Sequence, residues 1–159
     1  MSRERSAPRE SWHHHEPADV MNRLFPHYRL NEPGTPDVEC RALGTQAIEL
    51  YAGDFLPDID MPWANMRRLE LREKYLSFLE HFAAHEFEHA RFEDARGVYA
   101  QAVSKDPYQD SLHLGLMKCL VQLKAPAAAK AHYVQYRQTL LAEVGVEPGK
   151  ELQIFAGSL

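Results

Sequence analysis

Two histidines and a glutamate stand at a spacing that could hold a metal ion. The run His85-Glu86-Phe87-Glu88-His89 satisfies the H-E-x-x-H pattern. On a helix this pattern sets two imidazoles one turn apart to bind zinc, while the glutamate polarises a water molecule. His81 adds a third imidazole at the same spacing. The pattern raises the hypothesis of a zinc hydrolase acting through His85, Glu86 and His89.

The residues around the motif favour a simpler interpretation. The helix that would carry it has its apolar residues on other faces, and Ala90-Arg91-Phe92 leads directly into the next helix. A metalloprotease also needs a distal ligand and a substrate cleft, and the sequence assigns neither. A solvated helix face is the preferred interpretation, with an incidental surface metal site and the hydrolase as the alternatives.

No other group of residues has the pattern of a catalytic or cofactor site. Cys40 and Cys119 lie far apart without metal-ligand spacing, so we interpret them as free thiols of the core. The triplet His13-His14-His15 is interpreted as part of a solvated tail, and the serines lie in no activating constellation. We predict a protein without enzymatic activity and without a cofactor, and we assign no catalytic, cofactor-binding or metal-ligating residue.

Helices are the elements that would position these side chains. Apolar periodicity, together with the placement of proline and glycine, predicts helical segments along most of the chain after residue 37. The predicted helices cover residues 38–51, 64–89, 92–104, 108–124 and 127–144, with a short last helix beginning at Pro148.

The second half of the chain repeats at an interval of 34 residues. Ala95 and Ala129 are separated by this interval, and so are Tyr99 and Tyr133. The period is typical of tetratricopeptide-like helix pairs, in which each pair buries its apolar face against the next. The predicted fold is therefore all-α, with antiparallel helix pairs stacked into a small bundle or solenoid, and both tyrosines are expected to be substantially buried.

Charge and composition limit the classes of partner. Residues 1–36 hold five arginines, five acidic residues and five of the ten prolines, and are expected to form a disordered tail or linker. Residues 37–159 carry the whole net charge of −5, so strong direct binding to nucleic acid by this chain is not expected. No membrane-spanning run or signal peptide is recognised. A cytoplasmic location is expected.

A segment rich in turns joins the first predicted helix to the long one. Pro57 and Pro62 break the helical pattern there, while Phe55, Leu56 and Trp63 are large apolar residues that favour burial. We expect these three side chains to pack against the bundle. The same segment contains Asp54, Asp58 and Asp60, which we expect to be solvent-accessible and to include residues that face a partner.

Two signatures resemble the bacterial transcriptional activator domain. The first is Leu-Tyr-Ala-Gly-Asp-Phe-Leu-Pro at residues 50–57, followed by Pro-Trp at residues 62–63. The second closes the chain, with Gly-Val-Glu-Pro-Gly-Lys-Glu-Leu at residues 145–152. The likeness covers roughly residues 38–156. It identifies residues 37–159 as a domain similar to the one that follows a winged-helix DNA-binding domain in regulators of the SARP type.

The resemblance implies a non-enzymatic module for protein interaction or dimerisation in a bacterial transcriptional regulator. Its partners would be the transcription machinery, a DNA-binding domain or a second copy of the chain, as in a homodimer. The alternative is a stand-alone tetratricopeptide-like scaffold that binds a peptide or a small ligand in its groove. The zinc hydrolase described above is the remote alternative.

Overall fold

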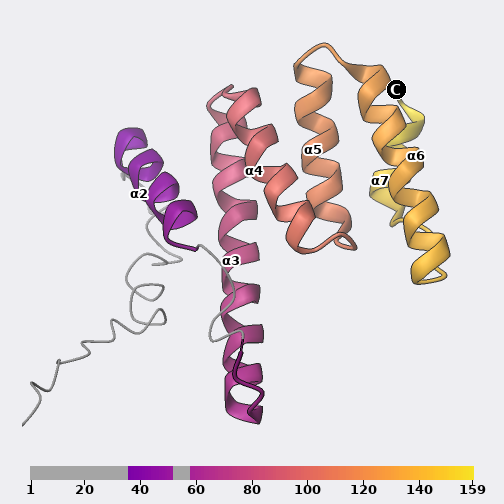
Figure 1. Ribbon diagram of the computed structural model, residues 1–159. Helices are drawn as coiled ribbons and strands as arrows, with labels where there is room; N and C mark the ends of the chain where they lie inside the picture. The colour runs from indigo at the N-terminus through magenta and orange to yellow at the C-terminus, as the bar shows by residue number, and fades with distance from the viewer. Residues whose placement is uncertain (1–35, 52–57) are drawn as a thin grey trace, which may run out of the picture.

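The protein is a stack of antiparallel helices in a computed structural model that describes residues 36–51 and 58–159 (Figure 1). Its helices are α2 (Asp37–Leu50), α3 (Pro62–Glu88), α4 (Phe92–Lys105), α5 (Asp110–Gln122), α6 (Pro126–Glu143) and α7 (Lys150–Gly157). No strand occurs in these ranges. The prediction of an all-helical fold built from stacked helix pairs is confirmed. The prediction of a disordered tail falls almost wholly on residues outside the described ranges.

Helix ends follow the proline and backbone signals in the sequence. Pro62 and Pro126 each take the first position of a helix, where the missing amide donor does no harm. The long helix thus begins two residues before the predicted start at residue 64. The last helix begins at Lys150, because Pro148 lies in the connection that precedes it.

The backbone repeats the 34-residue period found in the sequence. Ala90 and Lys124, which lie 34 positions apart, both have positive φ angles, of 59° and 62°. Each follows the first helix of a pair. The amide of the next residue donates a hydrogen bond to a carbonyl of that helix, from Arg91 to Glu86 at 2.9 Å and from Ala125 to Leu120 at 2.9 Å. This hydrogen-bond pattern is a Schellman-type helix end. The two helix pairs therefore turn in the same way.

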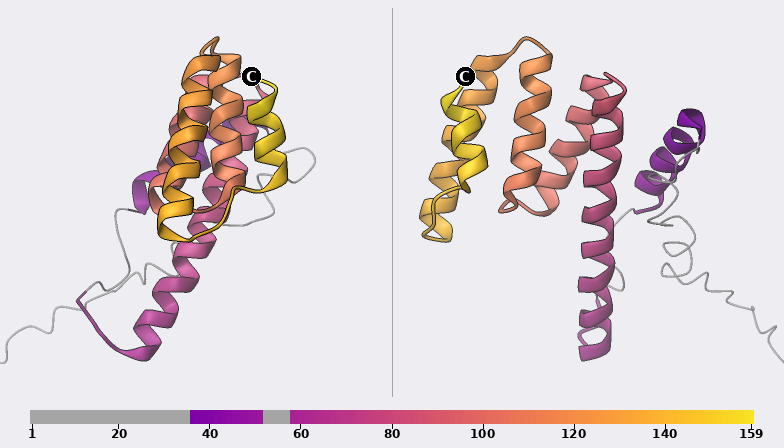
Figure 2. Two further views of the ribbon diagram at one scale, coloured as in Figure 1. Left: turned by 90° about the vertical axis from the view of Figure 1, so that its right-hand side faces the viewer. Right: turned by 180° about the vertical axis from the view of Figure 1, so that it is seen from behind.

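Helix α5 forms part of both hydrophobic cores. Leu112, Leu116 and Cys119 pack with α3 and α4, whereas Leu114 and Met117 pack with α6 and α7. A helix that is apolar on both sides in this way must lie between neighbours. Figure 2 shows α5 between the α3–α4 pair and the α6–α7 side. Cys40 and Cys119 are free and buried, as predicted.

The tyrosines of the repeat are buried to different extents. Tyr99 is buried in the first core as expected, but Tyr133 is only half-buried at the rim of the second. Tyr136 takes the buried place on α6. Among the described helices, α6 makes its main contacts with α5 and α7, and Tyr133 lies at the edge of the core that they form.

Asp110 fastens the end of the chain to the bundle. One carboxylate oxygen accepts a hydrogen bond from the Tyr136 hydroxyl at 2.6 Å, and the other accepts one from the Gly149 amide at 2.6 Å. A Cβ at position 149 would lie 2.5 Å from that second oxygen, so a larger residue here would have to displace the Asp110 carboxylate from this position. Arg137 adds two hydrogen bonds to Glu147. These contacts fix where α7 starts.

Among the helices that the structure describes, none combines the length and the apolar character needed to cross a membrane.

Two glycines test how tightly α4 and α5 pack. A methyl group at Gly115 would overlap the ring of Tyr99, whereas one at Gly97 would meet no atom within 4 Å. We expect Gly115→Ala to lower the free energy of unfolding by about 1–3 kcal/mol through overpacking. Gly97→Ala should raise it by about 0.5–1 kcal/mol, because alanine favours the helix. Urea unfolding of both variants measures the difference, and equal stabilities would contradict the α4–α5 packing.

Candidate functional site

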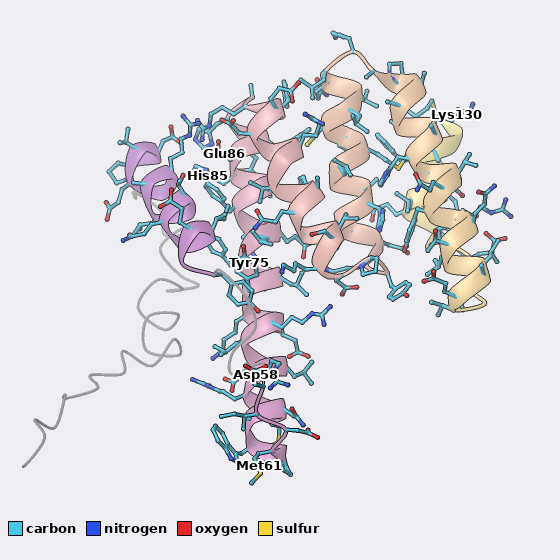
Figure 3. The ribbon with its side chains drawn as sticks, viewed as in Figure 1. Asp58, Met61, Tyr75, His85, Glu86 and Lys130 are labelled. Atoms are coloured by element: carbon cyan, nitrogen blue, oxygen red, sulfur yellow. The ribbon has the colours of Figure 1, made fainter. Side chains whose placement is uncertain are left out.

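The H-E-x-x-H residues lie in the last turns of α3, beside the first turn of α2 (Figure 3). The expectation that this helix face is solvated is wrong for two of its residues. Glu86 is 1% exposed, and the side chain of His85 is largely buried. The cause is α2, which brings Asp37 and Arg41 to this end of α3. His89 remains exposed.

Glu86 is held by two arginines. Arg91 donates from Nε to Oε2 at 2.5 Å and from Nη2 to Oε1 at 2.9 Å, and Nε of Arg41 lies 3.5 Å from Oε2. Burial by itself raises the pKa of Glu86, but the Arg91 hydrogen bonds and charge outweigh it and hold the pKa below the ordinary value of 4.5. Glu86 is therefore a carboxylate at neutral pH, bound on both oxygens. It is not placed to act as the general base of a zinc hydrolase.

Arg91 also binds Asp37, the first residue of α2. Its Nη2 lies 2.7 Å from Oδ1 of Asp37, and its Nη1 lies 3.1 Å from Oδ2. The Arg91 hydrogen bond, which opposes desolvation, lowers the pKa of Asp37 below its ordinary value. One guanidinium group thus bridges the end of α3 and the start of α2.

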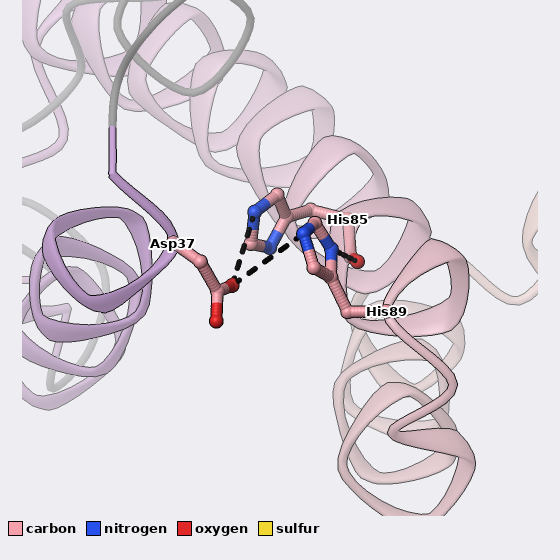
Figure 4. A group of neighbouring side chains, drawn as sticks. All are labelled: Asp37, His85 and His89. Carbon is pink, nitrogen blue, oxygen red and sulfur yellow. Dashed lines mark hydrogen bonds and ion pairs between the residues drawn. The ribbon is translucent and has the colours of Figure 1, made fainter.

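The two histidines meet Asp37 at the same oxygen (Figure 4). Nε2 of His85 lies 3.5 Å from Oδ1 of Asp37, and Nε2 of His89 lies 3.8 Å from it. Nδ1 of His89 bonds to the backbone carbonyl of His85 at 2.8 Å, and Nδ1 of His85 lies 3.4 Å from Oε1 of Glu86. One ligand atom from each of Asp37, His85 and His89 falls within 4.8 Å of the others. Sequence reasoning found the histidines but missed Asp37.

A second histidine pair lies between α5 and α6. His113 Nε2 lies 3.0 Å from the carbonyl of Pro107, so this nitrogen carries the proton. His113 Nδ1 then accepts from Nε2 of His132 at 2.9 Å. Burial lowers the pKa of His113 to about 4, against 6.5 ordinarily. The pair is neutral at pH 7, and a proton added at Nδ1 would face another donor.

The amino-terminal half of α3 presents an exposed apolar face. We define the α3 tip face as Trp63, Met66 and Leu69, whose exposed fractions are 55%, 71% and 57%. Figure 1 shows this half of α3 extending beyond the ends of the other labelled helices. The expectation that Trp63 packs against the bundle is therefore wrong, because α4 has 14 residues and α3 has 27. Phe55 and Leu56 lie outside the described residues.

The predicted acidic residues lie beside this face. Asp58 and Asp60 are exposed, as expected, and Oδ1 of Asp60 accepts a hydrogen bond from Asn65 at 3.0 Å. Asp54 lies outside the described residues. That these aspartates face a partner stays a prediction.

A comparison with protein families identifies the chain. The family model of the bacterial transcriptional activator domain matches residues 29–158. The chain belongs to this family. The match spans all six described helices, and it confirms the resemblance seen in the sequence. Searches of curated proteins and of solved structures gave no significant match.

Several signature residues of this bacterial transcriptional activator domain have structural roles. Pro62 begins α3, Tyr51 stacks on Tyr75 with ring centroids 3.8 Å apart, and Gly149 approaches Asp110. These residues set helix angles and ends. The signature that identifies the domain therefore does not by itself locate its interaction surface.

The ion pair of Glu86 and Arg91 yields a stability prediction. Arg91→Leu leaves a buried carboxylate without its main partner, and we expect it to cost about 3–5 kcal/mol of unfolding free energy. The double variant Glu86→Leu/Arg91→Leu should regain most of this loss. Arg96→Leu, which breaks the exposed pair with Glu93, should cost under about 1 kcal/mol. Chemical unfolding measures all three, and similar losses in Arg91→Leu and Arg96→Leu would refute the role of the buried pair.

The second histidine pair predicts how stability depends on pH. Because the folded-state pKa of His113 lies below that of the unfolded chain, the unfolded state binds more protons between about pH 6.5 and 4. Stability should therefore fall as the pH is lowered through this window. His113→Gln should flatten the slope of melting temperature against pH, whereas His81→Gln, at an exposed position, should leave it unchanged. An unaltered slope in His113→Gln would contradict the neutral pair.

Proposed function

We propose that the chain is a non-enzymatic interaction module of a bacterial transcriptional regulator in the cytoplasm, and that a second copy of the chain binds the α3 tip face. The single observation that supports this is the exposure of Trp63, Met66 and Leu69 along one helix. Trp63 and Met66, and Met66 and Leu69, are each three residues apart, so successive members are neighbours on the helix surface. Large apolar and aromatic groups gathered in this way are typical of the buried centre of protein interfaces.

The charges that flank the face favour a second copy as the occupant. Asp58 and Asp60 precede α3, whereas Arg72, which also donates to the carbonyl of Lys105, follows the apolar residues. A two-fold interface brings the same patch of both copies together. If two α3 helices cross antiparallel at Met66, Asp60 of one copy lies opposite Arg72 of the other, because both are six residues from the crossing point. The acidic end of each helix would then meet Arg72 of its partner.

The prediction is a concentration-dependent dimer of the 159-residue chain. Trp63→Ser should weaken dimerisation by about 30-fold, because truncating a central aromatic anchor costs about 2 kcal/mol or more. Ile154→Ser is the matched control, since Ile154 is 74% exposed on α7, and it should leave the dimer unchanged. Sedimentation analysis between about 1 and 100 μM measures the dissociation constants.

Charge reversal tests the antiparallel pairing. Asp60→Lys and Arg72→Glu should each weaken the dimer, and the double variant should restore it, because the two charges face each other again. A chain that stays monomeric at the highest concentration would overturn self-association through this face. Its membership of the activator-domain family would be unaffected.

A further inference from the structure

Three potential metal ligands from two helices converge where α2 meets α3. Asp37 is the first residue of α2, and His85 and His89 lie one turn apart at the end of α3. We propose that Asp37, His85 and His89 bind one divalent transition-metal ion, with zinc as the preferred ion, and that the ion fastens α2 to α3. This site is independent of the α3 tip face.

The hydrogen bonds of the histidines determine which nitrogens are free. A backbone carbonyl only accepts, so Nδ1 of His89 carries the proton that it donates to His85. Nδ1 of His85 lies 3.4 Å from Oε1 of Glu86, which is longer than an ordinary hydrogen bond, but a carboxylate oxygen nearby favours the tautomer with the proton on Nδ1. In the neutral rings, both Nε2 lone pairs then point at Asp37 (Figure 4). A cation between the three atoms would satisfy both lone pairs as well as the carboxylate.

The distances suit a shared metal ion better than direct hydrogen bonds. The Nε2 atoms lie 3.5 and 3.8 Å from Oδ1 of Asp37, whereas N–H···O bonds measure about 2.7–3.2 Å. Ligands at about 2.0–2.1 Å from a tetrahedral zinc ion lie about 3.3 Å from one another. A small inward movement of the three side chains would complete this geometry.

The surroundings provide the support that metal ligands ordinarily have. Glu86 and the carbonyl of His85 orient the two rings through Nδ1. Arg91 holds both oxygens of Asp37, with Nη1 on Oδ2 and Nη2 on the Oδ1 that faces the histidines, which leaves a second lone pair of Oδ1 for the ion. Such outer partners fix the tautomer of each imidazole and the direction of each ligand. His89 is 41% exposed on its side chain, so solvent can supply a fourth ligand.

The role of the ion would be structural. A hydrolytic zinc site needs a free carboxylate beside the metal-bound water, and both oxygens of Glu86 are bonded to Arg91. An ion held by Asp37 and the two histidines joins the start of α2 to the end of α3. Metal binding should therefore protect α2 from opening, because binding free energy adds to the stability of the arrangement that binds.

The experiment uses the 159-residue chain and zinc chloride. The consecutive histidines 13–15 could bind zinc independently, so His13, His14 and His15 are replaced by Gln in a reference variant. We expect this variant to bind one zinc ion per chain in calorimetry. Zinc should also slow hydrogen exchange across residues 37–50. Adding His89→Gln, at the most exposed of the ligands, should weaken binding at least about tenfold.

Further variants separate the site from general effects. His81→Gln, on the same helix, should leave zinc affinity unchanged, and Asp37→Asn should reduce it with the helical content preserved in circular dichroism. The proposal is overturned if the reference variant binds no zinc. It is also overturned if His89→Gln and Asp37→Asn both retain full affinity, or if zinc binds without slowing exchange in α2.

Discussion

The buried carboxylate of Glu86 is the constraint on which the arrangement of α2 depends. A charge with 1% exposure must be paired, because an isolated carboxylate in such a place would cost several kcal/mol. Arg91 supplies the pairing from the start of the next helix, and its remaining donors reach Asp37 on α2. A contact between α2 and α3 supports the same placement. Gly44 of α2 lies so close to the ring of Phe82 that a Cβ at this position would overlap it. The position of Asp37, and with it the grouping of the histidines, follows from this pairing.

The difference in length between α3 and α4 explains where the apolar face lies. At about 1.5 Å per residue, the 27 residues of α3 span about 40 Å and the 14 residues of α4 about 21 Å. The helix–helix core therefore covers only the carboxyl-terminal half of α3, from Leu71 to Ala83. Residues that precede Leu71 have no partner in α4. Trp63 and Met66 are exposed for this geometric reason.

Local signals in the sequence were enough to predict the helices but not the polar site. Proline and the 34-residue period predicted the helix pairs. Proline acts on the local backbone, and the period reflects packing between helices that are neighbours in the sequence. Asp37 could not be found in this way, since it meets Arg91 across 54 positions. One signal was available: Glu86 continues the spacing of Leu79 and Ala83, so a charge stood on the apolar stripe of α3. A charge there, with an arginine five residues later, indicates a buried pair. The exposure of Trp63 was missed because its apolar side chain suggests burial whatever the length of the neighbouring helix.

The two ends of α3 should act independently. His85 and Met66 are 19 residues apart, or about 28 Å along the helix axis. Changes at sites separated by more than about 10 Å, without shared partners, are usually additive in free energy. The metal-ligand group contacts α2 and the start of α4, whereas the α3 tip face lies beyond the core and shares no side chain with it. Coupling between the two sites would require a second conformation of α3 that both sites favour or disfavour. A continuous helix packed against α4 along half its length offers no such second conformation. A metal ion at one end would therefore set the order of α2 without altering self-association at the other.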